Sequence, residues 1–425
     1  MRATRRPALV VAIGAGLAIV TGVAVARQTM LLAVTGGLLA AIVPSWLPLG
    51  AAVVFTKPRV DLLPETHALP LTLSDALLLA WLLRRVAQRA RWSDLAPFPP
   101  ARWLGAFMVW AWAGCLVAGA STTALGRVTT YAAIAILGIR DRHDRRRVLT
   151  ALSVYALVVF VASLPEGASY LDGAWLGDPH QAGMLFLAGA APLLSGELLT
   201  ARYRNAAIAS RLAGCALLLG AVFTFRRGIW AAVVVMALVA FMPRANRARI
   251  AFLVVAVLAI GYVAYTPVTH AFGLNVSSFE LRQQSIVQGI REGTDSPLFG
   301  RGWAAFSERA ATELTEATPD GGSAYNTFVN LFAATGIVGV TLFAGFLLSL
   351  LRRVAADRTV LLFTVAFVTL SFTETTLYAG SLLTLVFFVY AGLARVPPRR
   401  VAQNDATANI ATLRAAPTTA AVVRP

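Results

Sequence analysis

Charged residues are scarce in this chain. Asp, Glu, Lys and Arg together make up only 13% of the residues, whereas hydrophobic residues make up 58% and the mean hydropathy is +0.70. A soluble protein is nearer half apolar and a quarter charged, so the composition excludes an ordinary soluble domain. It predicts an all-α integral membrane protein that folds as one polytopic helical bundle.

Lysine is almost absent as well. Lys57 is the only one, and the formal net charge of +17 therefore comes from arginine. A charge of this size is often a sign of nucleic-acid binding. Here the arginines lie in short clusters between apolar runs, a pattern that instead indicates membrane topology and contact with anionic lipid headgroups.

Metal-ligand spacings and the common catalytic motifs are also missing. Cys115 and Cys215 lie in apolar stretches and imply neither a disulfide nor a metal framework. The histidines are scattered along the chain at His67, His143, His180 and His270. The sequence contains no P-loop, no Asp-x-Asp pair and no Gly-x-Ser-x-Gly elbow. It therefore predicts no metal site and no cofactor.

Apolar runs long enough to form membrane-spanning helices recur along the chain. We predict about 12–14 transmembrane helices, near 8–26, 29–43, 45–56, 72–86, 101–119, 125–139, 148–164, 181–199, 207–225, 228–243, 250–267, 326–350, 359–373 and 376–394. Pro44 and Pro48 either divide 29–56 into two short helices or kink a single one.

Arginine clusters fall on alternate loops, and the positive-inside rule assigns those loops to the cytoplasm. The clusters are Arg84/Arg85/Arg89/Arg91, Arg140/Arg142/Arg145/Arg146/Arg147, Arg202/Arg204, Arg244/Arg247/Arg249 and Arg352/Arg353/Arg358. The external loops are then 165–180, 226–227, 268–325 and 374–375. The N-terminus, with Arg2, Arg5 and Arg6, is internal, which requires an even number of spans.

The two ends of the chain raise separate questions. Residues 1–26 end in Ala24-Val25-Ala26, like a signal-peptide cleavage site. The apolar run before it is longer than a usual signal h-region, which favours an uncleaved span. Residues 395–425 are polar and lack periodicity, so we predict a disordered cytoplasmic tail. The membrane domain is expected over 1–394.

The external loop 268–325 is the only sizeable loop. Its segment 278–292 predicts an amphipathic helix, because Phe279, Ile286 and Ile290 share one face at helical spacing. Arg282 falls beside that face. This arginine either snorkels to the surface or binds an anion.

Other polar groups are predicted at the same membrane face. Arg226 and Arg227 interrupt the apolar hairpin FTFRRGIW on the external side, against the positive-inside trend. They form either a functional site or a turn that contacts headgroup phosphates. Glu374, in SFTETTLYAG, either caps a helix or belongs to a shared polar site.

A further polar cluster, Ser323 and Tyr325–Thr327, precedes the apolar run that begins at 326. It either caps that helix or lines the same site, and both can hold. Arginine forks bind phosphate bidentately, and a carboxylate can accept a proton from a hydroxyl. Together these groups suit the displacement of a pyrophosphate leaving group by an acceptor alcohol.

Three segments occur in an order that resembles a known family. They are RRGIW at 226–230, PLFGRGWAAF followed by AYNTFVNLFAATGIVG within 297–339, and SFTETTLYAG at 371–380. They resemble the O-antigen ligase and O-antigen polymerase (Wzy-like) superfamily of polytopic membrane glycosyltransferases over about 180–394. The motif residues are Pro297, Gly300, Gly302 and Phe306, which match the family's Pro-x-x-Gly-x-Gly-x-x-x-Phe run, with Asn326 and Gly336 in the helix that follows.

This resemblance implies a GT-C-like helical fold with one large external loop over the site. It implies transfer of a glycan from a polyprenyl-pyrophosphate carrier without a metal. Our working hypothesis is that an acceptor hydroxyl attacks the anomeric carbon with inversion. By position, Arg227 is similar to the family's hairpin arginine that contacts pyrophosphate and Arg282 to the arginine of the loop helix. Glu374 stands where the family carries an acidic residue near the last spans.

One departure from the family concerns Tyr325, which stands where ligases usually carry a histidine. A phenol is a poor base at neutral pH, so either Glu374 takes the proton or this branch differs in mechanism. The resemblance therefore leaves ligase and polymerase both open. We also expect Gly336 and Gly339 to let a neighbouring helix approach closely.

The predicted site residues follow from these readings. Glu374 and Tyr325 are the catalytic candidates, Arg226, Arg227 and Arg282 the pyrophosphate ligands, and Asn326, Arg301 and His180 further substrate-binding residues. The expected partners are a lipid-linked glycan donor, a hydroxyl acceptor and membrane lipids, at the outer face of a bacterial cytoplasmic membrane. The alternatives are a transporter or flippase of an anionic lipid or solute, and a non-catalytic scaffold of an envelope-assembly complex.

Overall fold

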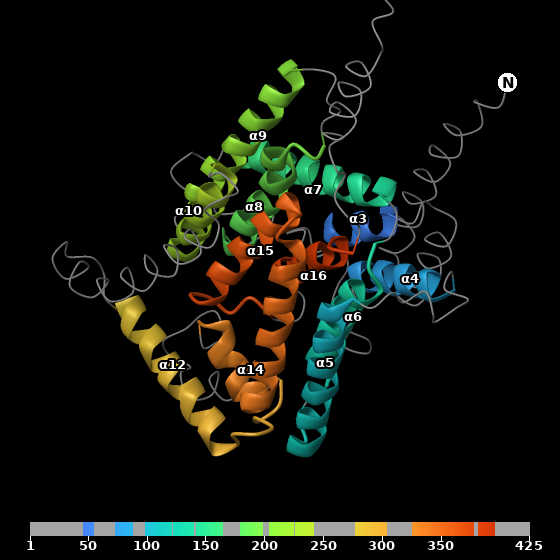
Figure 1. The fold of residues 1–425 in the computed structure, drawn as a ribbon. Coiled ribbons are helices and arrows are strands. Elements are labelled where there is room, and N and C mark those ends of the chain that lie inside the picture. Colours follow the sequence, from blue (N-terminus) through green and yellow to red (C-terminus); the bar gives the residue numbers. More distant parts are fainter. Residues whose placement is uncertain are drawn as a thin grey trace, which may run out of the picture.

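In the part of the chain that it describes, the computed structural model consists of α-helices and the turns at their ends (Figure 1). It describes residues 46–54, 73–87, 98–120, 122–139, 142–164, 179–198, 204–224, 226–241, 277–303, 325–377 and 381–395. The helices are α3 (Trp46–Val54), α4 (Leu73–Ala87), α5 (Pro99–Ala118), α6 (Thr123–Leu137), α7 (Arg142–Ser163), α8 (Pro179–Ser195), α9 (Arg204–Val222), α10 (Arg227–Phe241), α12 (Ser277–Asp295), α14 (Thr327–Val354), α15 (Arg358–Ser371) and α16 (Leu382–Leu393).

These helices confirm the prediction of an all-α polytopic membrane protein. Among the described residues, α5, α7, α9 and α14 are long and apolar enough to cross a membrane. The amphipathic segment 278–292 is helical as predicted and forms most of α12. The predicted spans at 8–26, 29–43 and 250–267 and the predicted tail from 396 onward lie outside the described residues.

Helices α8, α15 and α16 form the centre of the bundle. Every residue of α16 is buried, as expected for a helix that is hydrophobic all round. Its rings stack on α15, with Phe367 and Phe387 3.7 Å apart between centroids and Phe363 and Tyr390 4.2 Å apart. Helix α8 runs antiparallel to α15: His180, at its start, contacts Glu374, and Ser195, at its end, contacts Thr359. The three helices therefore have two common ends, and each end carries polar groups.

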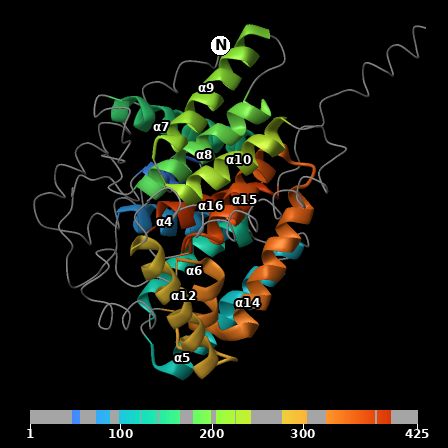
Figure 2. The ribbon, with the colours of Figure 1, turned by 90° about the vertical axis from the view of Figure 1, so that its left-hand side faces the viewer.

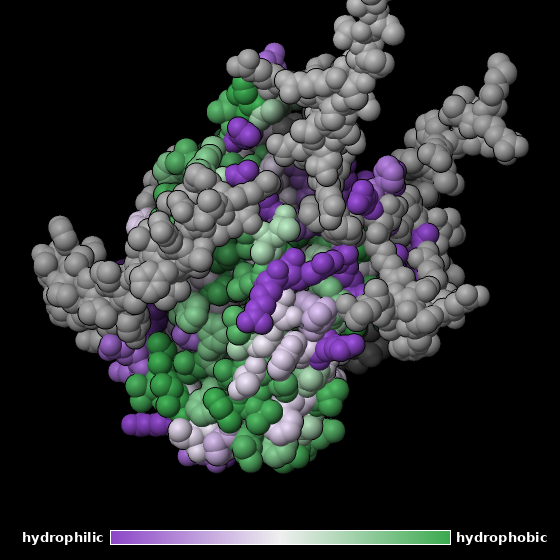
Figure 3. Space-filling model, viewed as in Figure 1, coloured by the Kyte–Doolittle hydropathy of each residue, from purple (hydrophilic) through white to green (hydrophobic). Residues whose placement is uncertain are grey.

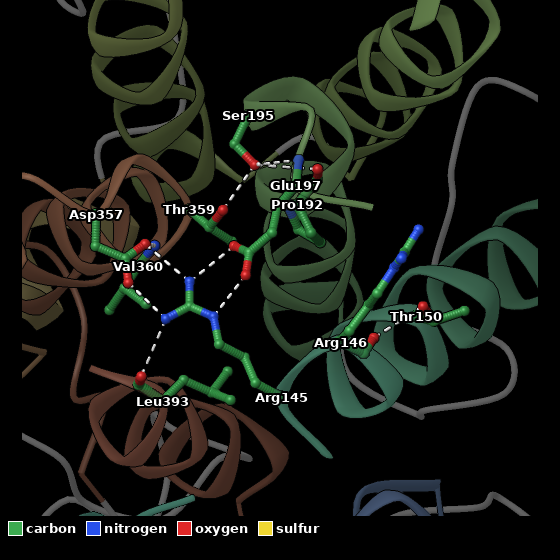
Figure 4. A network of polar contacts seen from close by, with 10 residues as sticks. All are labelled: Arg145, Arg146, Thr150, Pro192, Ser195, Glu197, Asp357, Thr359, Val360 and Leu393. Carbon is green, nitrogen blue, oxygen red and sulfur yellow. Dashed lines mark hydrogen bonds and ion pairs between the residues drawn. The ribbon is translucent and has the colours of Figure 1, made fainter. Parts of the chain in front are cut away.

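At one of these ends, Arg145 joins three other segments through a buried ion network (Figure 4). Its guanidinium bonds Glu197 after α8 at 2.5 and 2.7 Å and Asp357 before α15 at 2.6 and 2.9 Å. It also donates to the Leu393 carbonyl of α16. The residue is 1% exposed, so its cost of burial is offset only because every donor faces an acceptor. The sequence reading placed Arg145 among the topology arginines of a cytoplasmic loop, whereas the structure shows that it locks helix ends together.

Helix α14 covers the span predicted near 326–350, but it is broken and not one straight helix. At Gly336 the backbone adopts φ 67° and ψ −174°, which no continuous helix allows. The arm before the break is about 13 Å long and the arm after it about 27 Å, so only the second arm approaches the length of a membrane span. Figure 1 shows the two arms in orange, and Figure 2 shows α12 beside them.

The break is filled by the loop that carries the Pro-x-x-Gly-x-Gly run. The amides of Arg301 and Gly302 donate to the carbonyls of Ala333 and Ala334, and Ile337 donates to the Pro297 carbonyl. Thus the backbone groups that α14 leaves unpaired at its break find partners, which a membrane interior requires.

The predicted role of the Gly336/Gly339 pair is corrected by this arrangement. A Cβ on Gly336 would meet the Leu298 carbonyl, so the glycine admits a loop and not a neighbouring helix. A Cβ on Gly339 would meet the side chain of Thr335 in its own helix. Trp110 of α5 completes the contact, since its indole donates to the Thr335 carbonyl at 3.0 Å and stacks on Phe299 at 4.5 Å.

Candidate functional site

The candidate site lies at the end of the bundle opposite the Arg145 network. Helices α8, α10 and α14 begin here, α15 ends here, and the N-terminal half of α12 lies alongside (Figure 1). The turn after α15 carries Glu374, and residues from each of the other helices contact that turn.

Glu374 is the centre of this arrangement. Arg282 Nη2 lies 3.0 Å from its Oε1, and His180 Nε2 lies 3.1 Å from the same oxygen. Arg282 also donates from Nη1 to the Thr373 carbonyl at 3.2 Å. Within the described part of the chain, the second carboxylate oxygen, Oε2, contacts no other polar group. One oxygen is therefore engaged by two donors while the other remains available.

The Glu374 carboxylate is nearly buried, with 11% of its side chain exposed. Burial alone would raise the pKa of Glu374, but the hydrogen bond and charge of His180 and the charge of Arg282 outweigh it and lower the pKa below its ordinary value. The carboxylate is thus held ionised at neutral pH, and its basicity depends first on His180 and then on Arg282.

Tyr325 supports Arg282 from the other side. The guanidinium carbon lies 4.8 Å from the centroid of the Tyr325 ring, within cation–π range. The backbone of Tyr325 has φ +46°, in the left-handed region that residues other than glycine seldom adopt. Strain of this kind is held by surrounding structure and clusters at functional sites.

Asn326 ties the start of α14 to the same turn. Its Oδ1 caps the helix by accepting from the amides of Phe328 and Val329, at 2.9 and 3.1 Å. Its Nδ2 donates to the Phe372 carbonyl at 3.0 Å. The capping reading of this cluster therefore holds, and the same side chain also positions the turn that carries Glu374.

A buried row of hydroxyl groups holds this turn from behind. Thr327 donates to the Glu374 carbonyl at 2.9 Å and also accepts from the Thr376 amide at 2.8 Å. The Thr376 hydroxyl lies 2.9 Å from both the Thr327 and Ser371 hydroxyls. Sequence reasoning did not single out Ser371 or Thr376, although the density of Ser and Thr in SFTETT was a signal.

The two hairpin arginines reach the same end of the bundle. Helix α10 begins at Arg227, and a Cβ on the next residue, Gly228, would lie 2.5 Å from Thr373 Oγ1. The start of α10 therefore packs directly against the turn before Glu374. The Nε of Arg226 is buried and has no hydrogen-bond partner among the described residues, whereas Arg227 is exposed.

Arg301 is placed elsewhere. Its Nη2 lies 2.7 Å from Asp295 and its Nε 3.4 Å from Glu292, both in the last turns of α12. Arg282 lies in the first half of the same helix, about 20 Å away along the axis. The structure thus brings His180, Arg282, Tyr325, Asn326 and Glu374 together with the start of α10, and keeps Arg301 apart. No cluster of three or more His, Cys, Asp or Glu side chains that could hold a metal occurs in the described ranges.

Residues 212–344 match a family model described as O-antigen ligase. This range contains α10, α12 and the first arm of α14, and hence Arg226, Arg227, Arg282 and Tyr325; His180 and Glu374 lie on either side of it. No curated protein matches the chain. The resemblance to the O-antigen ligase and polymerase family is confirmed over the matched range.

Proposed function

From the O-antigen ligase match and the geometry at Glu374, we propose that this protein is a membrane glycosyltransferase. It transfers or polymerises a glycan from a polyprenyl-pyrophosphate carrier onto an acceptor hydroxyl. The observation that carries the proposal is the contact of Arg282 and His180 with one oxygen of Glu374, beside the start of α10. An anion-binding group and a proton acceptor thus share one site.

Arginines are the proposed ligands of the diphosphate. Arg282 stands on α12, and Arg226 and Arg227 stand at the start of α10, so the cationic groups approach from separate helices. A guanidinium can bind phosphate oxygens bidentately. The amides at the start of α10 add the positive end of a helix dipole, which favours an anion at this place.

The proposed reaction is a single displacement. The acceptor oxygen attacks the anomeric carbon from the face opposite the leaving group, and a new carbon–oxygen bond forms with inversion. The bond between that carbon and the pyrophosphate breaks, and the electron pair leaves with the polyprenyl pyrophosphate. The arginines compensate the negative charge that develops there, without a metal ion, and the acceptor proton passes to Glu374.

Glu374 has two states in this proposed reaction, one paired with Arg282 and one after Arg282 has bound the diphosphate. Arg282 pairs with Glu374 Oε1 and, together with His180, keeps the carboxylate weakly basic. A diphosphate competes for Arg282 because it carries more charge than a carboxylate. Once Arg282 binds the donor, Glu374 retains only His180, its basicity rises, and Oε2 can accept the acceptor proton. In this scheme His180 positions the Glu374 carboxylate. Tyr325 positions the Arg282 guanidinium, which lies over its ring.

We place the site at the outer face of a bacterial cytoplasmic membrane. The arginine cluster at 142–147 includes Arg145 and therefore lies at the end of the bundle that carries the Arg145 network. Arg352 and Arg353 at the end of α14, and Arg358 at the start of α15, also lie away from the Glu374 turn. The positive-inside rule assigns that arginine-rich side to the cytoplasm. Membrane lipids, the glycan donor and a hydroxyl acceptor are the proposed partners.

The experiment is a transfer assay with purified protein in proteoliposomes. A polyprenyl-pyrophosphate-linked glycan and an acceptor glycan are supplied, and both the released polyprenyl pyrophosphate and the elongated product are measured. We expect Arg227→Ala to abolish transfer while inserting normally, and Arg211→Ala, an exposed arginine on α9, to retain it. EDTA should leave the rate unchanged.

The assay also separates the alternatives. A transporter or flippase would move the lipid-linked glycan across the bilayer without releasing polyprenyl pyrophosphate. A scaffold would neither move nor cleave it. Wild-type-like product from Arg227→Ala would refute the assignment of the hairpin arginine.

A further inference from the structure

A groove lies between α5 and the second arm of α14, at the basic end of α14. It has a volume of about 740 Å³ and is bordered by the first residues of α5 and the last turns of α14. Its lining residues are Pro99, Pro100, Trp103, Thr341, Ala344, Gly345, Leu348, Ser349, Arg352 and Arg353. None of them belongs to the Glu374 site.

Most of the groove wall is apolar and open to the outside of the bundle. Trp103 is 42% exposed and Leu348 is 56% exposed. A Cβ on Gly345 would lie 2.6 Å from the Trp103 ring, so the glycine makes room for the indole beside α14. Figure 3 shows a largely green and pale surface over α5 and α14, with hydrophilic side chains in purple above it. Half-exposed tryptophan is typical of the boundary between hydrocarbon and headgroups.

Two arginines close the groove at its polar end. Arg352 and Arg353 are exposed, and neither contacts an acceptor in the part of the chain that the structure describes. In contrast, Arg145, Arg282 and Arg301 all pair with carboxylates. Arginines in the last turn also suit the negative end of the α14 dipole, but that explanation does not require them to line an apolar groove.

We propose that this groove binds a membrane phospholipid with an anionic headgroup. One acyl chain lies along Trp103, Gly345 and Leu348, and the phosphate lies against Arg352 and Arg353. The charge of the two guanidinium groups complements a phosphate at the depth where the apolar wall ends. The site is independent of the glycan-transfer reaction, because it lies at the far end of α14 from Tyr325 and Glu374.

Native mass spectrometry of the full-length protein tests this proposal. The protein is released from detergent after incubation with phosphatidylglycerol or phosphatidylcholine of the same acyl chains. We expect phosphatidylglycerol to be retained preferentially by the wild type. Arg352→Gln/Arg353→Gln should weaken that preference by about fivefold for each arginine, the effect typical of a basic residue at an anionic membrane surface. The matched control, Arg142→Gln/Arg211→Gln, removes two exposed arginines outside the groove and should keep it.

A second variant tests the apolar wall separately. Ala344→Phe fills the groove without removing charge and should reduce the retention of both lipids. Glycerol phosphate, which carries no acyl chain, distinguishes a phosphate site from a lipid site. It should not compete with phosphatidylglycerol. The proposal is overturned if both lipids are retained equally, if the groove variants behave like the control pair, or if glycerol phosphate competes as well as the lipid. It is also overturned if the groove is covered by a second copy, which would appear as a dimer lost in Ala344→Phe.

Discussion

Arg282 and Glu374 form an ion pair with 3.0 Å between Nη2 and Oε1, although they come from α12 and from the turn after α15. The pair joins the helix of the predicted external loop to the centre of the bundle. It also brings the proposed anion ligand and the proposed proton acceptor into direct contact. Removing Arg282 therefore takes away a charge that helps to lower the pKa of Glu374, and removing Glu374 leaves Arg282 without its carboxylate partner.

Arg282→Ala should lower the transfer rate by about 100-fold or more, because one preorganised contact to the leaving group typically contributes about 3 kcal/mol in the transition state. The matched control is Arg301→Ala. Arg301 follows α12 in the same described segment as Arg282, but it pairs with Asp295 and Glu292 and not with Glu374. It should retain most of the activity. Equal losses in the two variants would contradict the separate placement of these arginines.

Tyr325 is expected to act through its ring. Tyr325→Phe keeps the face on which Arg282 rests, at 4.8 Å, and should keep most of the activity. Tyr325→Ala removes that face and should raise the concentration of donor needed for half-maximal rate. If the phenol itself transfers a proton, Phe would be as inactive as Ala, and the steady-state kinetics of the two variants would coincide.

The stability of the protein should depend on pH through Glu374. The contacts of Glu374 with His180 and Arg282 lower its pKa in the folded protein. These contacts therefore stabilise the folded protein at pH values above the unfolded pKa of about 4.3. Their contribution is lost as the pH falls through the folded-state pKa. Thermal unfolding from pH 7 to pH 3 should therefore show a stability gap between wild type and Glu374→Gln that closes at the acid end. A gap that widens towards pH 3 would mean that the folded-state pKa is raised instead.

Arg145→Met should destabilise the protein by about 3–5 kcal/mol, since it leaves the buried Asp357 and the partly buried Glu197 close together without a counter-charge. Arg146→Met is the matched control, because Arg146 is exposed and its guanidinium donates to the Leu198 backbone carbonyl, not to a carboxylate. Unfolding in detergent, followed by circular dichroism, measures both. Adding Glu197→Gln and Asp357→Asn to Arg145→Met should recover part of the loss, and failure to recover would refute the electrostatic explanation.

Gly336→Ala should destabilise the break in α14. The residue has φ 67°, where alanine costs about 1–2 kcal/mol, and its Cβ would also meet the Leu298 carbonyl. Gly105→Ala in α5 meets nothing within 4 Å and should be neutral or stabilising by up to about 1 kcal/mol. Protease sensitivity of the 297–303 connection gives a second readout, since this loop docks on the break. Equal stability of the two variants would exclude the proposed fit.

Several features were predictable from local pattern. Apolar runs located α5 to α10 and α14 to α16, and the face shared by Ile286 and Ile290 located α12. The convergence of Arg282, Tyr325, Asn326 and Glu374 followed from assigning their segments to one membrane face. The break at Gly336 was not predictable in the same way, because Thr335-Gly336 inside an apolar run is equally consistent with close helix packing.

The sequence alone determined that the chain is an all-α membrane protein, where most of its helices lie and which polar segments share an end of the bundle. These properties depend on hydrophobicity and charge over neighbouring residues, which local order records. Only the tertiary structure decided that Arg145 is a buried partner of two carboxylates while Arg352 and Arg353 are not, and that Glu374 pairs with both Arg282 and His180. Such pairings depend on which helix ends meet in space. When two partners are far apart in the chain, the sequence around either of them does not indicate the other.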